Sequence, residues 1–304
     1  MTVVARAQGL TKKYGSAQAL TNINLTLEEG LIYGLAGRNG SGKTTLLAAL
    51  VGQVIPTRGS IELFGAKPSG CVLARTHFQR THLAYPDGLK VRDVLRLASL
   101  AYPAWDETLA DTLIKDFALT PAAKARKLSD GQASALGITV ALASRAELTL
   151  MDEPYSGLDP VARAIFYDRL LADFALNPRT IVLSTHLLNE IAPLLDRVLM
   201  LRDGALVLDG SHDEAATSAH EIAGSQDAIN VYLARTGLAD AIARQRTIGS
   251  LVTALLAAPL TETNEQLAAS LGVHIQPVSL QDSLAVHSDA TYSPLLEPQG
   301  GRHD

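Results

Sequence analysis

The sequence predicts an α/β fold built around a mainly parallel sheet. Two nearly continuous apolar runs, residues 148–154 (LTLMDEP) and 180–186 (TIVLSTH), end in polar residues, as buried parallel strands do. Residues 161–176 between them have helical spacing of apolar side chains, which completes a β–α–β unit. A second strand–loop–helix unit surrounds the glycine-rich residues 37–44.

Short strands and one helix are expected in the first 65 residues. The strands show alternation of apolar and polar residues or a short apolar run, and the helix has leucines at three- and four-residue spacing. The expected strands are 2–7, 20–27, 31–37 and 60–65, and the expected helix is 43–54.

The region from about 76 to 147 is predicted to be mainly helical. Apolar residues recur at helical spacing in 91–102, 107–119 and 130–145, and Pro103 and Pro121 interrupt the pattern. The N-terminal strands, this helical region and the β–α–β unit that follows it are predicted to form a first domain over residues 1–210.

Residues 211–286 are expected to form a small accessory α/β region. It contains an alternating stretch at 250–257 and a helix-like stretch at 230–245. The last residues, 287–304, are polar with Pro and Gly, which predicts a mobile tail.

Composition limits the classes of function. Of 304 residues, 47% are hydrophobic and 19% are charged, which is enough apolar material for a packed core. The net charge of −5 argues against a general nucleic-acid binder, and the single cysteine, Cys71, excludes an intrachain disulfide. We expect no signal peptide, because the N-terminus has no charged start followed by a long apolar run. We expect no membrane span, because the longest apolar runs, such as 250–260, are shorter than the roughly 20 residues required.

Residues 37–44, GRNGSGKT, fit the P-loop pattern. Gly37, Gly40 and Gly42 let the backbone curl so that several N–H groups point at phosphate oxygens. The following helix directs its positive end at the same place. Lys43 is expected to reach the β and γ phosphates, and the hydroxyl of Thr44 is expected to bind Mg²⁺.

The apolar run 148–154 supplies the second half of such a site. Asp152 is expected to hold the Mg²⁺ shell, and Glu153 to orient or deprotonate the attacking water. Two adjacent acids favour hydrolysis over simple nucleotide binding.

With these motifs in this order, residues 10–190 resemble the ATP-binding subunit of a bacterial ABC transporter. The resemblance implies a P-loop NTPase cassette with a mixed-sheet core, an antiparallel β subdomain and a helical subdomain. Three further motifs carry it: LSDGQ at 128–132, SGLDP at 156–160 and STH at 184–186. It implies ATP and Mg²⁺ as cofactors.

The resemblance assigns roles to individual residues. Lys43, Glu153 and His186 would be catalytic, and Thr44, Gln79 and Asp152 would contact the metal. Arg80 is the alternative to Gln79, because the local sequence is irregular. Residues expected to contact ATP are Tyr14, Gly37, Asn39, Gly40, Ser41, Gly42, Lys43, Thr44, Thr45, Gln79, Ser129, Gly131, Gln132 and Asp159.

The resemblance also implies an assembly. Signature motifs such as 128–132 cap ATP held by the opposite subunit, so the chain is expected to pair head to tail with a copy or a related chain. Separate permease subunits in the membrane would use the motion, with this chain peripheral on the cytoplasmic face. Export is favoured over import, and no nucleic-acid partner is expected.

Other classes of protein fit these motifs less well. A soluble ABC-type ATPase acting on nucleic acid or ribosomes is the main alternative. A P-loop kinase or GTPase would leave the signature unexplained, and the guanine-selecting NKxD is absent. A non-hydrolysing partner subunit conflicts with the presence of Gly131, Glu153 and His186.

Asp130 replaces a glycine of the family's signature, which puts a negative charge near the expected phosphate. We hypothesise that Asp130 caps the helix that starts there, because carboxylates are favoured at helix N-termini by roughly 0.3–1 kcal/mol, and that the interface still works.

Overall fold

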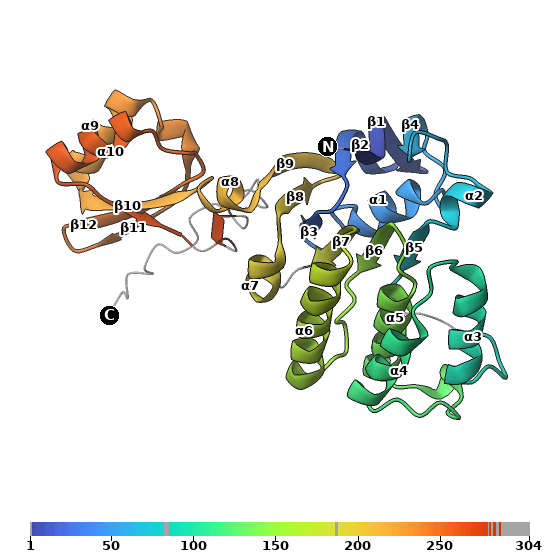
Figure 1. Cartoon of the computed structure of the whole chain (residues 1–304). Helices are drawn as coiled ribbons and strands as arrows, with labels where there is room; N and C mark the ends of the chain where they lie inside the picture. The colour runs from blue at the N-terminus through green and yellow to red at the C-terminus, as the bar shows by residue number, and fades with distance from the viewer. Residues whose placement is uncertain are drawn as a thin grey trace, which may run out of the picture. The chain divides into compact units, whose positions relative to one another are not determined.

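Figure 1 shows the computed structural model of the chain. It describes residues 2–81, 85–185 and 188–278, together with residues 280, 282, 283 and 286, and of residues 188 and 189 the backbone only. The chain divides into two compact units, with the boundary between Asp209 and Gly210. Within the described ranges, no helix has both the length and the apolar character needed to cross a bilayer.

The core of the first unit is a six-stranded sheet in the order β5-β6-β7-β3-β8-β9. The predicted strands at 148–154 and 180–186 are confirmed as β6 and β7, which are parallel and buried along their whole length. They read as continuous apolar runs because both faces of the sheet are covered. The bounds are β3 Ile32–Ala36, β5 Thr76–Gln79, β6 Leu148–Asp152, β7 Thr180–Thr185, β8 Arg197–Arg202 and β9 Ala205–Ser211.

A three-stranded antiparallel sheet, in the order β2-β1-β4, packs on helix α1 and the central sheet. Its strands are β1 Val3–Tyr14, β2 Ala17–Glu28 and β4 Arg58–Leu63, so the first two are longer than predicted. Helix α1, Lys43–Leu50, stops before the predicted end at 54. It ends there because Gly52 takes a left-handed conformation, with φ of 72°.

The helical part contains α2 Gly70–Leu73, α3 Val91–Ala101, α4 Glu107–Asp116 and α5 Asp130–Ala143. In Figure 1, α3, α4 and α5 lie together below β5 and β6, with α5 next to α6. A separate small core holds them, formed by Val91, Ile114, Leu119, Ala135 and Leu136. The predicted start of the helical region at 76 was too early, because residues 76–79 pair with β6 in the central sheet.

Helix α6, Pro160–Leu176, connects β6 to β7, and α7, Leu188–Ile191, follows β7. An ionic chain joins the C-terminal end of α6 to the helical part. The Arg145 guanidinium contacts Asp106 at 2.6 Å and Asp173 at 2.9 Å, and Arg179 contacts Asp173 at 2.7 Å. Asp106 is also the N-cap of α4.

The second unit contains a four-stranded antiparallel sheet in the order β11-β12-β10-β13. Helices α9 and α10 cover one face of it, and Ile222, Tyr232, Val252 and Ala268 contribute to the core between them (Figure 1). The bounds are α8 His212–Ala216, β10 His220–Ser225, α9 Gln226–Thr236, β11 Ile242–Ile248, β12 Leu251–Leu256, α10 Glu262–Leu271 and β13 His274–Pro277.

This sheet and its helices lie in the segment for which a small accessory α/β region was expected, and the helix-like stretch predicted at 230–245 was wrong in its second half. Helix α9 ends at Thr236, because Gly237 takes a left-handed conformation, and residues 242–248 form strand β11 instead. Short 3₁₀ turns occur at Ala125–Lys127, Ala192–Leu194 and Ala239–Ala241. The predicted tail, 287–304, lies outside the described residues.

Candidate active site

The glycine-rich loop joins the carboxyl end of β3 to the start of α1. Gly37, Gly40 and Gly42 all have positive φ, at 144°, 83° and 106°. A Cβ on Gly37 would lie 2.4 Å from the Leu201 carbonyl oxygen, and one on Gly42 would lie 2.6 Å from the Ala19 carbonyl oxygen. Both space and backbone conformation therefore exclude side chains at these two positions.

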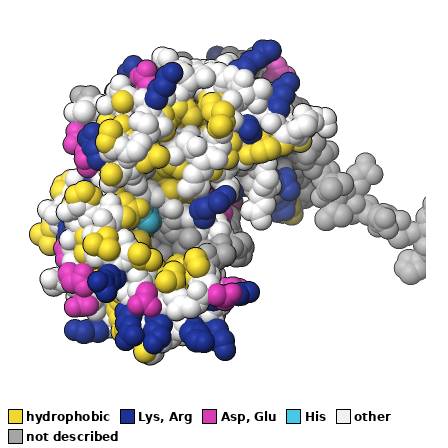
Figure 2. All heavy atoms as spheres, turned by 90° about the vertical axis from the view of Figure 1, so that its right-hand side faces the viewer, with side chains coloured by type: hydrophobic (Ala, Val, Ile, Leu, Met, Phe, Trp, Pro, Cys, Tyr) yellow, Lys and Arg dark blue, Asp and Glu magenta, His cyan; other side chains and the backbone are white. Residues whose placement is uncertain are grey.

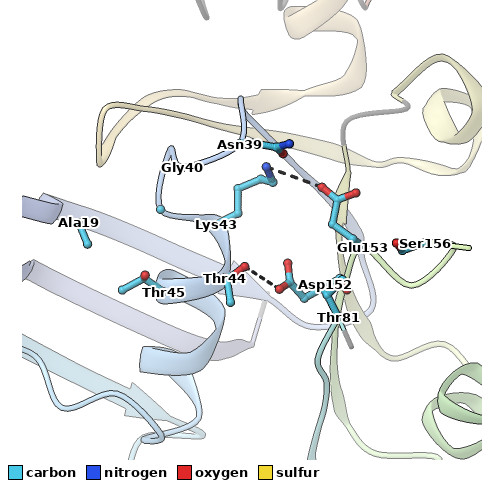
Figure 3. A pocket seen from close by; sticks show the side chains of 11 residues that line it. Ala19, Asn39, Gly40, Lys43, Thr44, Thr45, Thr81, Asp152, Glu153 and Ser156 are labelled. Carbon is cyan, nitrogen blue, oxygen red and sulfur yellow. Dashed lines mark hydrogen bonds and ion pairs between the residues drawn. The ribbon is translucent and has the colours of Figure 1, made fainter. Parts of the chain in front are cut away.

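A pocket of about 510 Å³ opens beside this loop. Figure 3 shows side chains from the loop and α1 on one side of it and from the end of β6 on the other. It is lined by Ala19, Asn39, Gly40, Gly42, Lys43, Thr44, Thr45, Thr81, Asp152, Glu153 and Ser156. Eight of these residues were predicted from the sequence: Asn39, Gly40, Gly42, Lys43, Thr44, Thr45, Asp152 and Glu153.

Lys43 is the first residue of α1, and its side chain is only 7% exposed. Its ammonium group donates hydrogen bonds to the carbonyl oxygens of Gly37, at 2.7 Å, and Arg38, at 3.3 Å. It also lies 3.7 Å from Glu153 Oε1. The Lys43 ammonium thus lies inside the loop, at the N-terminal end of α1. The positive charge of the side chain and the dipole of the helix both favour an anion there.

Asp152 ends strand β6 and is almost fully buried. Its Oδ2 accepts a hydrogen bond from the Thr44 hydroxyl at 2.6 Å, and its Oδ1 accepts one from the Ser184 hydroxyl at 2.6 Å. Carboxylate and hydroxyl oxygens are the protein ligands that Mg²⁺ prefers. The Thr44–Asp152 pair therefore fits a magnesium ion.

Glu153 follows with a positive φ of 48°, and its N–H donates to Ser184 Oγ at 2.9 Å. A left-handed conformation is uncommon for a residue other than glycine, and it turns the chain sharply at the end of the buried strand. The carboxylate thereby reaches the pocket wall opposite the loop, 15% exposed (Figure 3).

Ser41 adds a polar group to the loop. The residue is buried, and its Oγ has no hydrogen-bond partner among the described residues. Unpaired polar groups are rare in protein interiors, and those that occur often belong to binding sites. Its place within a loop of phosphate-binding shape agrees with the predicted contact to a nucleotide.

The predicted signature residues lie outside this pocket. Ser129 is the N-cap of α5, where its hydroxyl accepts from the Gln132 N–H and the Gln132 side chain accepts from the Ser129 N–H. The hypothesis that Asp130 caps the helix was therefore wrong in detail, because Asp130 occupies the first helical position and Ser129 is the cap. Asp130 still lies in the first turn, where the dipole favours its charge.

Gly131 packs against the loop that contains Gly157. A Cβ on Gly131 would lie 2.5 Å from the Gly157 carbonyl oxygen. Asp159, predicted to reach across a dimer, caps α6 by accepting from the Ala162 N–H at 2.8 Å. Residues 128–132 and 156–160 therefore lie side by side in one chain, each at the start of a helix.

Two predicted residues are elsewhere, and a third is not described. Tyr14 is 51% exposed at the end of β1, with the Lys12 ammonium 4.9 Å from its ring centroid, and does not line the pocket. Gln79 is 3% exposed within β5, and it does not line the pocket either. His186 lies outside the described residues.

Four residues of the site were not predicted from the sequence. Thr81 lines the pocket and donates from Oγ1 to the Asp152 carbonyl oxygen at 2.8 Å, two positions after Gln79. Ala19 and Ser156 also line it. Ser184 contacts both acids and belongs to the recognised STH motif, so its place beside the predicted His186 was the available signal.

Comparison with known proteins gives one family. The model of the ABC transporter family matches residues 20–156. The bacitracin transport ATP-binding protein of Bacillus licheniformis is 33% identical over 68% of this chain and 69% of its own length. A daunorubicin resistance ATP-binding protein of Streptomyces coeruleorubidus is 30% identical over 90% of both chains. The Nod factor export ATP-binding protein I of Rhizobium leguminosarum bv. viciae is 32% identical over 66% of this chain and 67% of its own.

Solved structures agree on the fold. An ATP-binding subunit of an ABC transporter is 25% identical, with a TM-score of 0.63, over 70% of this chain and 91% of that one. A dimeric bacterial ABC transporter cassette is 24% identical, with a TM-score of 0.61, over 68% and 98% of the two chains.

Proposed function

Because the chain belongs to the family of ABC transporter ATP-binding proteins, whose cassettes hydrolyse ATP, we propose that it is the ATP-hydrolysing subunit of a transporter with separate integral membrane permease subunits. The observation that carries this proposal is the pocket in which Lys43, Thr44, Asp152 and Glu153 meet. A cation, an oxygen pair suited to Mg²⁺ and a carboxylate base are the three parts that phosphoryl transfer to water needs.

Within this pocket, the ATP phosphates are placed against the loop 37–44. Its backbone N–H groups and the Lys43 ammonium stabilise the negative charge that is present in the ground state and redistributed in the transition state. Thr44 and Asp152 would hold Mg²⁺, which when bound supplies further neutralisation of phosphate charge. Ser41, whose buried hydroxyl has no hydrogen-bond partner in the described part of the chain, would donate to a phosphate oxygen.

Glu153 is the proposed general base. Its carboxylate lies on the wall opposite the loop, where it can accept a proton from a water aligned with the γ-phosphate. The Lys43 ammonium lies 3.7 Å from this carboxylate, on the side of the pocket where the phosphates are placed. His186, the residue after β7 in the sequence, is proposed to act at the γ-phosphate.

The signature residues Ser129, Gly131 and Gln132 and the D-loop residue Asp159 lie away from the pocket of their own chain. We propose that they meet the ATP of a second subunit in a head-to-tail dimer, either a copy or a related ATPase chain. ATP would close this dimer, and hydrolysis would open it. Tyr14 is proposed to stack on adenine, since its ring is half exposed.

Export is the proposed direction, because relatives are named for bacitracin transport, Nod factor export and daunorubicin resistance. Coupling to permeases implies a peripheral position on the cytoplasmic face of the membrane. The unit that begins at Gly210 is proposed to be an accessory module.

Purification of the full chain with and without its membrane partners tests the proposal. We expect Mg²⁺-dependent release of phosphate from ATP that is lost on chelation, and co-purification of the chain with a polytopic membrane protein. Absence of ATP binding by the full chain would overturn the proposal, and association with ribosomes instead of membranes would replace transport by the soluble-ATPase alternative.

A further inference from the structure

The segment that carries both acids, residues 152–156, is held at both ends by hydroxyl groups from other parts of the chain. Thr81 Oγ1 donates to the Asp152 carbonyl oxygen at 2.8 Å. Ser134 Oγ donates to the Ser156 carbonyl oxygen at 2.6 Å. We call residues 152–156 the acidic turn. Its own backbone closes through a hydrogen bond from the Ser156 N–H to the Glu153 carbonyl oxygen at 3.0 Å.

The acidic turn needs external support because of its backbone conformation. Glu153 has φ of 48°, and a residue with a Cβ in this region pays roughly 1–2 kcal/mol relative to the right-handed region. Such a conformation persists only where the surroundings impose it. Ser184 Oγ also accepts from the Glu153 N–H at 2.9 Å, so loss of a hydrogen bond at one end of the turn should loosen the placement of the Glu153 carboxylate without releasing it.

The two hydroxyl groups belong to different parts of the chain. Thr81 follows β5 on the loop that leads to α3. Ser134 lies in the second turn of α5, and the last three LSDGQ residues, 130–132, lie in the first turn. The Gly131–Gly157 contact strengthens the second link, because it leaves no space between the start of α5 and the end of the acidic turn.

We propose that Thr81 and Ser134 are positioning residues for ATP hydrolysis, which hold the two ends of the acidic turn and make the placement of Glu153 depend on the β5–α3 loop and on the start of α5. The proposal rests on the proposed function, in which Glu153 is the base. Changes in either the β5–α3 loop or the start of α5 would then alter the rate of ATP hydrolysis, because both hold the acidic turn. Neither side chain needs to touch ATP for this role.

Paired substitutions test each hydroxyl. Thr81→Val removes the donor with little change in shape, and Thr81→Ser keeps it. Ser134→Ala removes the second donor, and Ser134→Thr keeps it. Thr112→Val is the matched control, because its hydroxyl donates to the Thr108 carbonyl oxygen within α4, on the exposed surface.

We expect kcat for ATP to fall about five- to tenfold in Thr81→Val and Ser134→Ala, the loss that corresponds to one hydrogen bond. The KM for ATP and the Kd for ATP should change less than about twofold, since the loop 37–44 is untouched. The hydroxyl-retaining variants and Thr112→Val should keep wild-type kcat.

Amide hydrogen exchange supplies a readout that does not depend on turnover. Exchange at residues 153, 155 and 156 should accelerate in Thr81→Val and Ser134→Ala and stay at the wild-type rate in Thr81→Ser and Ser134→Thr. Wild-type kcat with unchanged exchange in both hydroxyl-deleted variants would overturn the positioning role. A wild-type chain that neither binds nor hydrolyses ATP would instead overturn the proposed function.

Discussion

Lys43 and Glu153 face each other across the pocket, with Nζ 3.7 Å from Oε1 and both side chains mostly buried. One starts the helix after the glycine-rich loop, and the other follows the central strand β6. Their opposite charges interact more strongly in this partly desolvated setting than they would in water. Each should therefore affect the other's role, and substitution of one residue at a time separates the two roles.

Substitution of Lys43 by alanine should reduce ATP turnover at least about a hundredfold, because the phosphates lose the cation inside the loop. Nucleotide binding should weaken as well, measured by titration with a fluorescent ATP analogue. Lys115→Ala, at an exposed position near the end of α4, is the control and should retain wild-type turnover. Turnover of Lys43→Ala at the wild-type rate would contradict the P-loop assignment.

Glu153→Gln should bind ATP but hydrolyse it at least about a hundredfold more slowly, because the amide does not accept the proton. The ATP-bound head-to-tail dimer should then accumulate, which size-exclusion chromatography with light scattering would detect in the presence of Mg-ATP. Glu147→Gln, in an exposed ion pair with Arg75, should stay like wild type. If Glu153→Gln remains monomeric with ATP bound, dimerisation requires the permease subunits or does not occur.

Asp130→Gly restores the residue found in the family's signature and should change ATPase activity by less than about threefold. Ser129 rather than Asp130 is the N-cap, so the substitution leaves the cap of α5 intact. The helix loses only the interaction of the Asp130 carboxylate with its dipole, which stabilises it by about 0.3–1 kcal/mol. Asp130→Asn separates charge from backbone freedom. An increase of tenfold or more in both variants would identify the charge as inhibitory.

His77 predicts a pH-dependent stability. It is buried in β5 beside the Tyr102 hydroxyl, and burial lowers its pKa from 6.5 to about 4. As the pH falls below 6.5, the unfolded chain binds a proton at this residue while the folded chain does not, so its contribution to stability is lost as the pH falls toward 4. From pH 7 to pH 5, His77 should therefore lower the free energy of unfolding by about 2 kcal/mol.

Urea denaturation of wild type and His77→Phe at both pH values, followed by the fluorescence of Trp105, would measure this contribution. The variant should lose about 2 kcal/mol less than wild type on acidification. Tyr102→Phe should keep the wild-type pH dependence, because it leaves the burial of His77 in place. Equal pH dependence in wild type and His77→Phe would show that the histidine is not the source.

The sequence predicted the parts of the fold whose physical constraint is local. The spacing of Gly37, Gly40 and Gly42 and the fully apolar run of β6 each follow from constraints on a few consecutive residues. The helical part was placed too early at residue 76, since β5 is a strand only through its pairing with β6. Four residues carry too little periodicity to distinguish a strand from a helix.

The pocket also contains residues that local sequence patterns do not predict. Gln79 was chosen from the sequence because its residue type matches the family, yet the pairing of β5 buries it and brings Thr81 to the pocket. A shift of two residues has no signal in composition, because it depends on where the strand ends. The contacts of Ser134 and Ser184 also depend on tertiary placement, which joins segments distant in the sequence.

The division of the chain at Asp209 and Gly210 determines how its unfolding should be followed. Each unit has its own hydrophobic core, so denaturation need not be a single cooperative transition. The one tryptophan, Trp105, belongs to the larger unit, and its fluorescence therefore reports on that unit alone. Melting of the smaller unit would pass unseen by this probe, and circular dichroism of the backbone would register both.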